Sequence, residues 1–164
     1  MNNFEVHITV EKVDGLDEAA VSLGCKVLYI ELDKGETPFQ PMLTFKIEDT
    51  RLSNVEIIVQ EYLRRLSDFN PIRVKIESEF KPESYLYTER HIKIPAVWVH
   101  GVRELGGHIS RNENKGTYFV TERNYDESLL SLLLEKGVPV LKVDDEFVIS
   151  DTNLDLDKGW LCQI

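Results

Sequence analysis

Two histidines in short alternating segments are the residues of this chain best suited to chemistry. His7 lies in FEVHITV with Thr9 two positions later, and His91 lies in ERHIKI with Lys93 two positions later. An unperturbed imidazole titrates near neutral pH, so two histidines that face one cleft can act as general acid and general base. Residues at i and i+2 of a strand share a face. We therefore predict His7 and His91 as catalytic residues, with Thr9 and Lys93 as substrate contacts.

More polar side chains fall on the same face of the predicted sheet. Strand alternation directs apolar residues to one face, and bases, hydroxyls and histidines gather on the other. The additional substrate-binding candidates are Thr44, Lys46, His108, Ser110, Arg111, Thr121 and Arg123. The segment His108-Ile109-Ser110 repeats the histidine–hydroxyl spacing, so His108 is an alternative to His91 as the second catalytic histidine. We prefer His91 because it lies in the first strand of its half, as His7 does. Arg111 either contacts a phosphate or belongs to an exposed turn.

Hydropathy periodicity divides a single domain into two halves, residues 1–80 and 84–150, followed by a C-terminal tail, 151–164. The predicted strands are 4–11, 26–32, 41–48, 71–78, 88–95, 106–112, 116–123 and 138–150, and the predicted helices are 16–24, 53–69, 96–105 and 126–137. Each half has the order β-α-β-β-α-β. We therefore predict an α+β fold of duplicated ferredoxin-like halves whose antiparallel sheets form a concave cleft.

Corresponding residues in the two halves favour an internal duplication. His7 corresponds to His91, and Thr44 corresponds to Thr121, each threonine being followed two residues later by a base. Lys75 of the first half has no counterpart in register. The alternative is that two similar α+β patterns arose by chance.

The segments His7-Ile8-Thr9-Val10 and His91-Ile92-Lys93-Ile94 resemble the paired His-x-Thr/Ser motifs of the 2H phosphoesterase superfamily. The first motif fits fully, whereas the second has lysine where that superfamily has a hydroxyl. The resemblance implies two lobes around a cleft and a metal-independent phosphodiesterase or cyclic phosphodiesterase acting on a nucleotide or RNA end. It implies that one histidine removes a proton from a 2′-hydroxyl or water while the other protonates the leaving oxygen. Segments such as PMLTF, GGHISRN and FVTER are also similar to an uncharacterised bacterial family, which adds no chemistry.

Acidic residues outnumber basic ones by 29 to 19, which gives a net charge of −10. Such a surface repels duplex DNA and anionic membranes, whereas bases gathered on one sheet face suit a small phosphorylated ligand such as a nucleotide or RNA end. The amino-terminal segment lacks a secretory pattern, no apolar run has the length of a membrane span, and two cysteines form no disulfide framework. We therefore expect a cytoplasmic protein.

Two other classes of function remain open from the sequence. One is a non-catalytic module that holds a nucleotide or anion on the basic face, which Lys93 in the second motif favours. The other is a ligand-free, oligomerising ferredoxin-like domain, since the sequence does not determine the oligomeric state. No P-loop, dinucleotide motif or Cys/His metal pattern is present, so neither cofactor nor metal is expected. Asp151, Asp155 and Asp157 lack the spacing of a calcium loop and indicate a solvated turn.

Overall fold

Eight antiparallel strands close into one barrel in the computed structural model, which describes residues 2–161. The strands are β1 Asn2–Val10, β2 Lys26–Leu32, β3 Phe39–Thr50, β4 Pro71–Ser78, β5 Tyr87–Ile94, β6 Ile109–Asn112, β7 Thr117–Arg123 and β8 Lys142–Asp151. The α-helices are α1 Leu16–Leu23, α2 Leu52–Arg65, α3 Val99–Glu104 and α4 Ser128–Glu135, and short 3₁₀ turns cover Ser67–Phe69, Ala96–Trp98 and Leu154–Asp157. Around the barrel the strands follow the order β1-β3-β2-β6-β7-β5-β8-β4.

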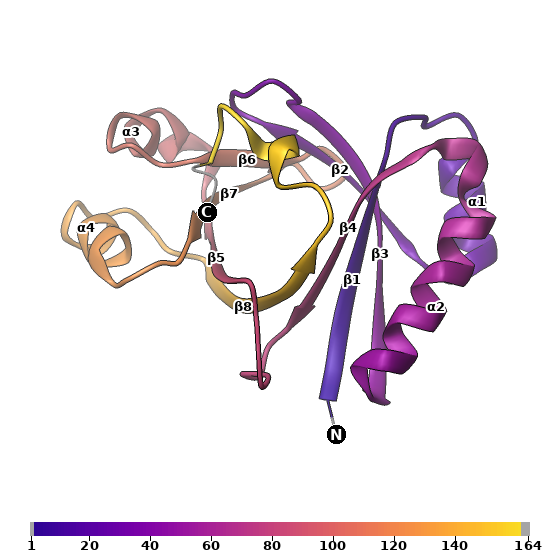
Figure 1. The fold of residues 1–164 in the computed structure, drawn as a ribbon. Coiled ribbons are helices and arrows are strands. Elements are labelled where there is room, and N and C mark those ends of the chain that lie inside the picture. The colour runs from indigo at the N-terminus through magenta and orange to yellow at the C-terminus, as the bar shows by residue number, and fades with distance from the viewer. Residues whose placement is uncertain (1, 162–164) are drawn as a thin grey trace.

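The closure of the barrel corrects the predicted concave cleft. The strands of the first half run β4-β1-β3-β2 and those of the second run β8-β5-β7-β6. The outer strands of the two sets pair with each other, β2 with β6 and β4 with β8. An open edge presents unpaired backbone donors and acceptors, and joining the two sets removes every edge. The prediction of duplicated ferredoxin-like halves with open sheets is therefore wrong, because the halves are two arcs of one barrel (Figure 1).

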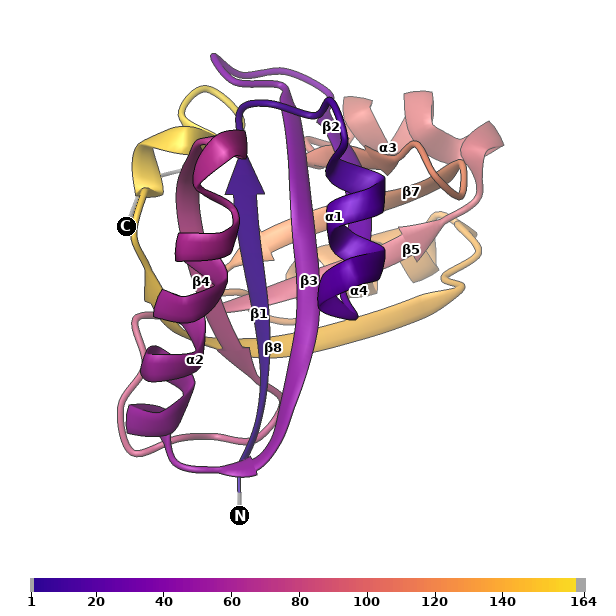
Figure 2. The same cartoon turned by 90° about the vertical axis from the view of Figure 1, so that its right-hand side faces the viewer.

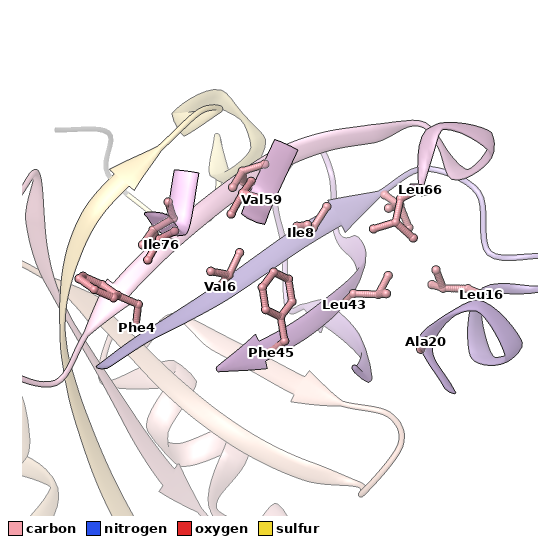
Figure 3. Close-up of a cluster of buried hydrophobic side chains, with 13 residues drawn as sticks. Phe4, Val6, Ile8, Leu16, Ala20, Leu43, Phe45, Val59, Leu66 and Ile76 are labelled. Atoms are coloured by element: carbon pink, nitrogen blue, oxygen red, sulfur yellow. The ribbon is translucent and has the colours of Figure 1, made fainter. Parts of the chain in front are cut away.

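Helices α1 and α2 cover the outer face of the first arc, on the opposite side of the molecule from α3 and α4 (Figures 1 and 2). Phe4, Val6 and Ile8 of β1 point outward into the apolar core beneath α1 and α2 (Figure 3). Val55 and Val59 of α2 complete this core from the helical side. Burial of these side chains stabilises the arc, at about 25 cal/mol for each Å² of apolar surface removed from water.

A second apolar core lies outside the other arc. Ile92 of β5 and Val120 of β7 pack there with Val102 of α3 and Leu133 of α4. Most strands thus turn their apolar row toward the helices and their polar row toward the interior of the barrel, whereas β2 directs Leu28, Ile30 and Leu32 inward. The interior, and not the apolar core, is consequently where the ionisable side chains meet.

The C-terminal segment packs over one end of the barrel after β8 (Figure 1). Trp160 and Leu161 are buried against Leu32, and the indole of Trp160 donates a hydrogen bond of 2.9 Å to the carbonyl of Ile109. The amide of Glu36 donates to the carbonyl of Lys158. Within residues 2–161, no helix has the length and apolar character needed to cross a bilayer.

Candidate functional site

A cavity of about 390 Å³ lies inside the barrel and is partly open to solvent. Apolar side chains contributed by β2, β3 and β7 line one side of it, namely Leu28, Ile30, Leu32, Met42 and Phe119. Ionisable side chains come mostly from β1, β4, β5 and β8, which are contiguous in the barrel order. The volume lies within the range of about 300–1,000 Å³ that is typical of ligand pockets.

Strand alternation brings most of the predicted site residues to this cavity. Those that line it are His7, Thr9, Lys46, His91, Ser110, Thr121 and Arg123. Thr44 is buried next to the cavity, where it contacts His7. Lys93, His108 and Arg111 are not among the described residues that line it.

The three candidates outside the cavity have other surroundings. Lys93 lies opposite Lys142 in the β5–β8 ladder, close to the end of β5. The ring of His108 meets that of Trp160 edge-on at 6.5 Å, and burial lowers the pKa of the imidazole. Arg111 is exposed and lies over the ring of Tyr118. The alternative second histidine, His108, therefore does not share the cavity with His7.

The two histidines occupy equivalent positions in two different ladders. His7 is paired with Thr44 across β1 and β3, and its Nδ1 lies 2.8 Å from the threonine Oγ1. His91 is paired with Thr121 across β5 and β7, and the corresponding distance is again 2.8 Å. A cross-strand partner fixes the plane of each imidazole, so both rings present Nε2 to the interior in a set orientation.

A chain of charged groups connects the two imidazoles through the interior. His7 Nε2 lies 3.2 Å from Oε2 of Glu77, and Oε1 of Glu77 forms an ion pair of 3.0 Å with Lys75 Nζ. Lys75 Nζ also donates a hydrogen bond of 2.7 Å to Oε1 of Glu89, which lies 3.1 Å from His91 Nε2. Both ring nitrogens of each histidine therefore have a partner within the protein.

The charges of this chain stabilise one another. Burial by itself would raise the pKa of Glu77, but Lys75 and His7 outweigh it and hold that pKa at about 2. Burial opposes ionisation of Glu89 as well, and Lys75 and His91 lower its pKa well below the ordinary value. Burial would lower the pKa of His91, yet the hydrogen bond to Glu89 raises it. The charged groups between the two histidines thus form an ion network in which each buried charge has a partner of opposite sign.

Glu77, Glu89 and His91 offer three ligand atoms within 4.8 Å of one another, a spacing that could hold a metal ion. The ammonium of Lys75 contacts both carboxylates, at 3.0 and 2.7 Å. The ammonium group of Lys75 therefore already supplies a cation between these carboxylates. A divalent ion would have to displace Lys75 and leave its charge unpaired.

A second ion network surrounds Asp157 where the C-terminal segment meets the barrel. Arg73 donates to Asp157 Oδ1 at 3.1 Å, and Gln40 donates to the same oxygen at 3.2 Å. Arg123 donates to the other carboxylate oxygen and, at 3.0 Å, to Glu89. Asp151 receives two further hydrogen bonds from Arg73.

Sequence reasoning missed the residues that complete these networks. Strand alternation places Lys75, Glu77 and Glu89 on the polar face, but no motif distinguishes them from solvated charges. The predicted solvated turn is wrong for Asp151 and Asp157, whose side chains are 0% and 2% exposed, because Arg73 binds both. No local signal could have indicated that pairing.

The cavity is also less basic than the predicted face. The bases that line it are Lys26, Lys46, Arg73, Lys75, Arg123 and Lys142, and the acids are Glu5, Glu77, Glu79, Glu89, Asp144, Glu146 and Asp157. Glu146 is surrounded by acids, and burial first, then Glu77, Glu5 and Glu79, raise its pKa to about 8. The interior is therefore close to neutral within an acidic protein.

Comparison with known proteins gives no family for this chain. No family model matches it, and no curated protein does. Among solved structures, it is similar to the acetolactate synthase small subunit from Thermotoga maritima, with 16% identity over 93% of this chain and 97% of that one and a TM-score of 0.32. It is also similar to a microcompartments protein from Desulfitobacterium hafniense DCB, with 12% identity over 92% and 96% of the two chains and a TM-score of 0.31. Scores this low support no inference from either protein.

The resemblance to the 2H phosphoesterase superfamily is wrong, and with it the assignment to the hydrolases. That resemblance requires two lobes that face each other across an open cleft, whereas these strands form one closed barrel. No family model supports it. The further similarity to an uncharacterised bacterial family has no matching family model either.

Proposed function

We propose that this chain is a non-catalytic binding module that encloses a small ligand in its barrel. The observation that carries the proposal is the cavity of about 390 Å³, with an apolar side facing a set of ionisable side chains. Eight-stranded barrels have an interior wide enough for one small ligand. Convergent polar groups beside apolar surface are the usual composition of such sites.

The state of the histidines favours binding over acid–base chemistry. A general base must reach the proton that it removes, at about 2.6–3.2 Å. Glu77 and Glu89 already engage the Nε2 atoms of His7 and His91, and Thr44 engages the remaining nitrogen of His7. Groups held in this way serve better as fixed hydrogen-bonding partners than as groups that exchange protons with a substrate.

The lining also narrows the kind of ligand. Leu28, Met42 and Phe119 suit a planar or aliphatic body. Thr9 and Ser110 are buried hydroxyls that line the cavity and can bond to polar groups of that body. A nucleoside or nucleotide has this combination, so a small phosphorylated ligand stays within the proposal.

The test is a thermal-shift screen of AMP, 2′,3′-cyclic AMP, adenosine and a library of small aromatic acids. We expect at least one compound to raise the melting temperature and to bind with 1:1 stoichiometry by calorimetry. Leu28→Trp fills the cavity from β2 and should abolish binding. Val21→Trp is the matched control, because Val21 is 81% exposed on α1 and should leave binding unchanged.

Three outcomes contradict the proposal. Binding that persists in a folded Leu28→Trp variant would place the ligand outside the barrel. Conversion of the bound compound to a product, lost in His7→Ala, would make the protein a catalyst. A library with no stabilising compound would favour the ligand-free, oligomerising alternative, which size-exclusion chromatography with light scattering then examines.

A further inference from the structure

The carboxylate of Asp157 occupies a site built by the barrel. Arg73 reaches it with two nitrogens, at 3.1 Å to Oδ1 and 2.8 Å to Oδ2, and Gln40 adds an amide donor at 3.2 Å. Arg123 donates to it from β7. The donors come from strands β3, β4 and β7, whereas the acceptor belongs to the segment that follows β8. Two guanidinium groups and an amide converging on one point form a donor set for a carboxylate or phosphate.

The donors at this site exceed what Asp157 accepts. Arg123 is 4% exposed, lines the cavity, and its Nη1 is buried without a hydrogen-bond partner among the described residues. A buried donor without a partner costs about 1–3 kcal/mol of desolvation, which an anion with more oxygens could recover. The site is therefore not filled completely by one aspartate side chain.

The segment that supplies Asp157 lies outside the barrel ladders. β8 ends at Asp151, and the 3₁₀ turn Leu154–Asp157 follows it. Besides the contacts of Asp157, hydrogen bonds join the segment to the barrel at Thr152, Asn153, Leu156, Lys158 and Trp160, and the side chains of Trp160 and Leu161 are buried. Its departure would break no strand pairing.

Both arginines keep an acidic partner when Asp157 leaves. Arg73 retains Asp151, whose side chain is 0% exposed, and Arg123 retains Glu89. The barrel therefore does not depend on Asp157 to avoid an uncompensated buried charge. The vacated place would be a pocket of free donors that opens into the cavity, since Gln40, Arg73 and Arg123 all line it.

We propose that Gln40, Arg73 and Arg123 form an oxyanion-binding site, which Asp157 fills in cis. A carboxylate or phosphate group of a bound molecule competes with Asp157 for this site and releases the C-terminal segment. This proposal extends the proposed function and rests on it in one respect. The rest of the ligand, beyond its carboxylate or phosphate group, would lie in the barrel cavity. Inorganic phosphate and acetate test the site alone, so its failure is distinguishable from failure of the barrel to bind an organic ligand.

The first experiment is thermal melting of Asp157→Ser in phosphate, acetate and chloride at equal ionic strength. Phosphate or acetate should raise the melting temperature of the variant by roughly 3–6 °C at tenfold above its Kd, relative to chloride. Wild type should gain less, because Asp157 holds the site. Adding Arg123→Lys, which keeps the charge and removes the planar fork, should weaken the gain. Asp14→Ser, at an exposed loop position, is the matched control and should behave as wild type.

The second experiment follows release of the segment in the wild-type protein. Lys158 is exposed directly after Asp157, so trypsin cleavage there, quantified by mass spectrometry, reports departure of the segment. Phosphate should speed this cleavage several-fold without changing cleavage after the exposed Lys12. Asp157→Asn, which keeps the shape of the side chain, replaces Asp157→Ser if the latter does not fold. Equal anion effects in the variant, wild type and Asp14→Ser, or cleavage at Lys158 that ignores phosphate, would overturn the proposal.

Discussion

Lys75 Nζ lies 2.7 Å from a carboxylate oxygen of Glu89, although their strands, β4 and β5, are not hydrogen-bonded neighbours. β8 runs between these two strands, so the contact is made by side chains inside the barrel. It joins the half that contains His7 to the half that contains His91. The polar interior is therefore one network shared by both halves.

Replacing Lys75 with methionine should destabilise the fold by about 3–5 kcal/mol, because Glu77 and Glu89 would lose their shared cation while remaining buried. Urea denaturation at pH 7 measures the change. Lys12→Met, at an exposed position, should alter stability by no more than about 0.5 kcal/mol. Equal effects of the two substitutions would mean that Lys75 is solvated and not part of the network.

The same Lys75→Met variant should acquire a divalent metal site. Without the ammonium, Glu77, Glu89 and His91 keep ligand atoms within 4.8 Å of one another and carry uncompensated charge. Zinc should therefore raise the melting temperature of Lys75→Met and leave wild type unchanged. Adding His91→Ala should remove the zinc effect, and EDTA should reverse it. Stabilisation of wild type by zinc to the same extent would show that Lys75 does not occupy that site.

Glu146 should make stability fall as the pH rises. Its pKa is raised to about 8, first by burial and then by Glu77, Glu5 and Glu79. A raised carboxyl pKa contributes stability below the ordinary value of about 4.5, and that contribution is lost as pH rises through the folded value. The free energy of unfolding of Glu146→Gln relative to that of wild type should therefore increase as the pH rises from about 4.5 to 8. Above about pH 8 the difference between the two proteins should stay constant. Urea titrations at several pH values check this, and a difference independent of pH would contradict it.

His91 should titrate above its ordinary range. Burial opposes protonation, but the hydrogen bond from Nε2 to Glu89 raises the pKa of the imidazole. Its contribution to stability is present below about pH 6.5 and disappears as pH rises through the folded value. NMR titration of the ring protons measures this directly. Glu89→Gln should lower the pKa of His91, whereas Glu104→Gln, which removes the exposed partner of His100, should not change it.

Alternation along the strands determined which side chains could meet. In β1, Phe4, Val6 and Ile8 are apolar, so the sequence alone assigns His7 and Thr9 to the opposite face. This argument predicted a shared polar face for His7 and His91 without any motif. It could not predict the shape of that face, because alternation is the same in an open sheet and in a closed barrel.

Only the tertiary structure decided how that face is used. Barrel closure depends on β2 meeting β6 and on β4 meeting β8, and these pairings link strands remote in the sequence. The same long-range packing buries Asp157, which local sequence presents as a solvated turn residue, against Arg73 and Arg123. Residue types and alternation thus determined a polar face. Closure of the barrel converted that face into a charge-balanced interior, because a buried charge is stable only beside a partner that long-range contacts supply.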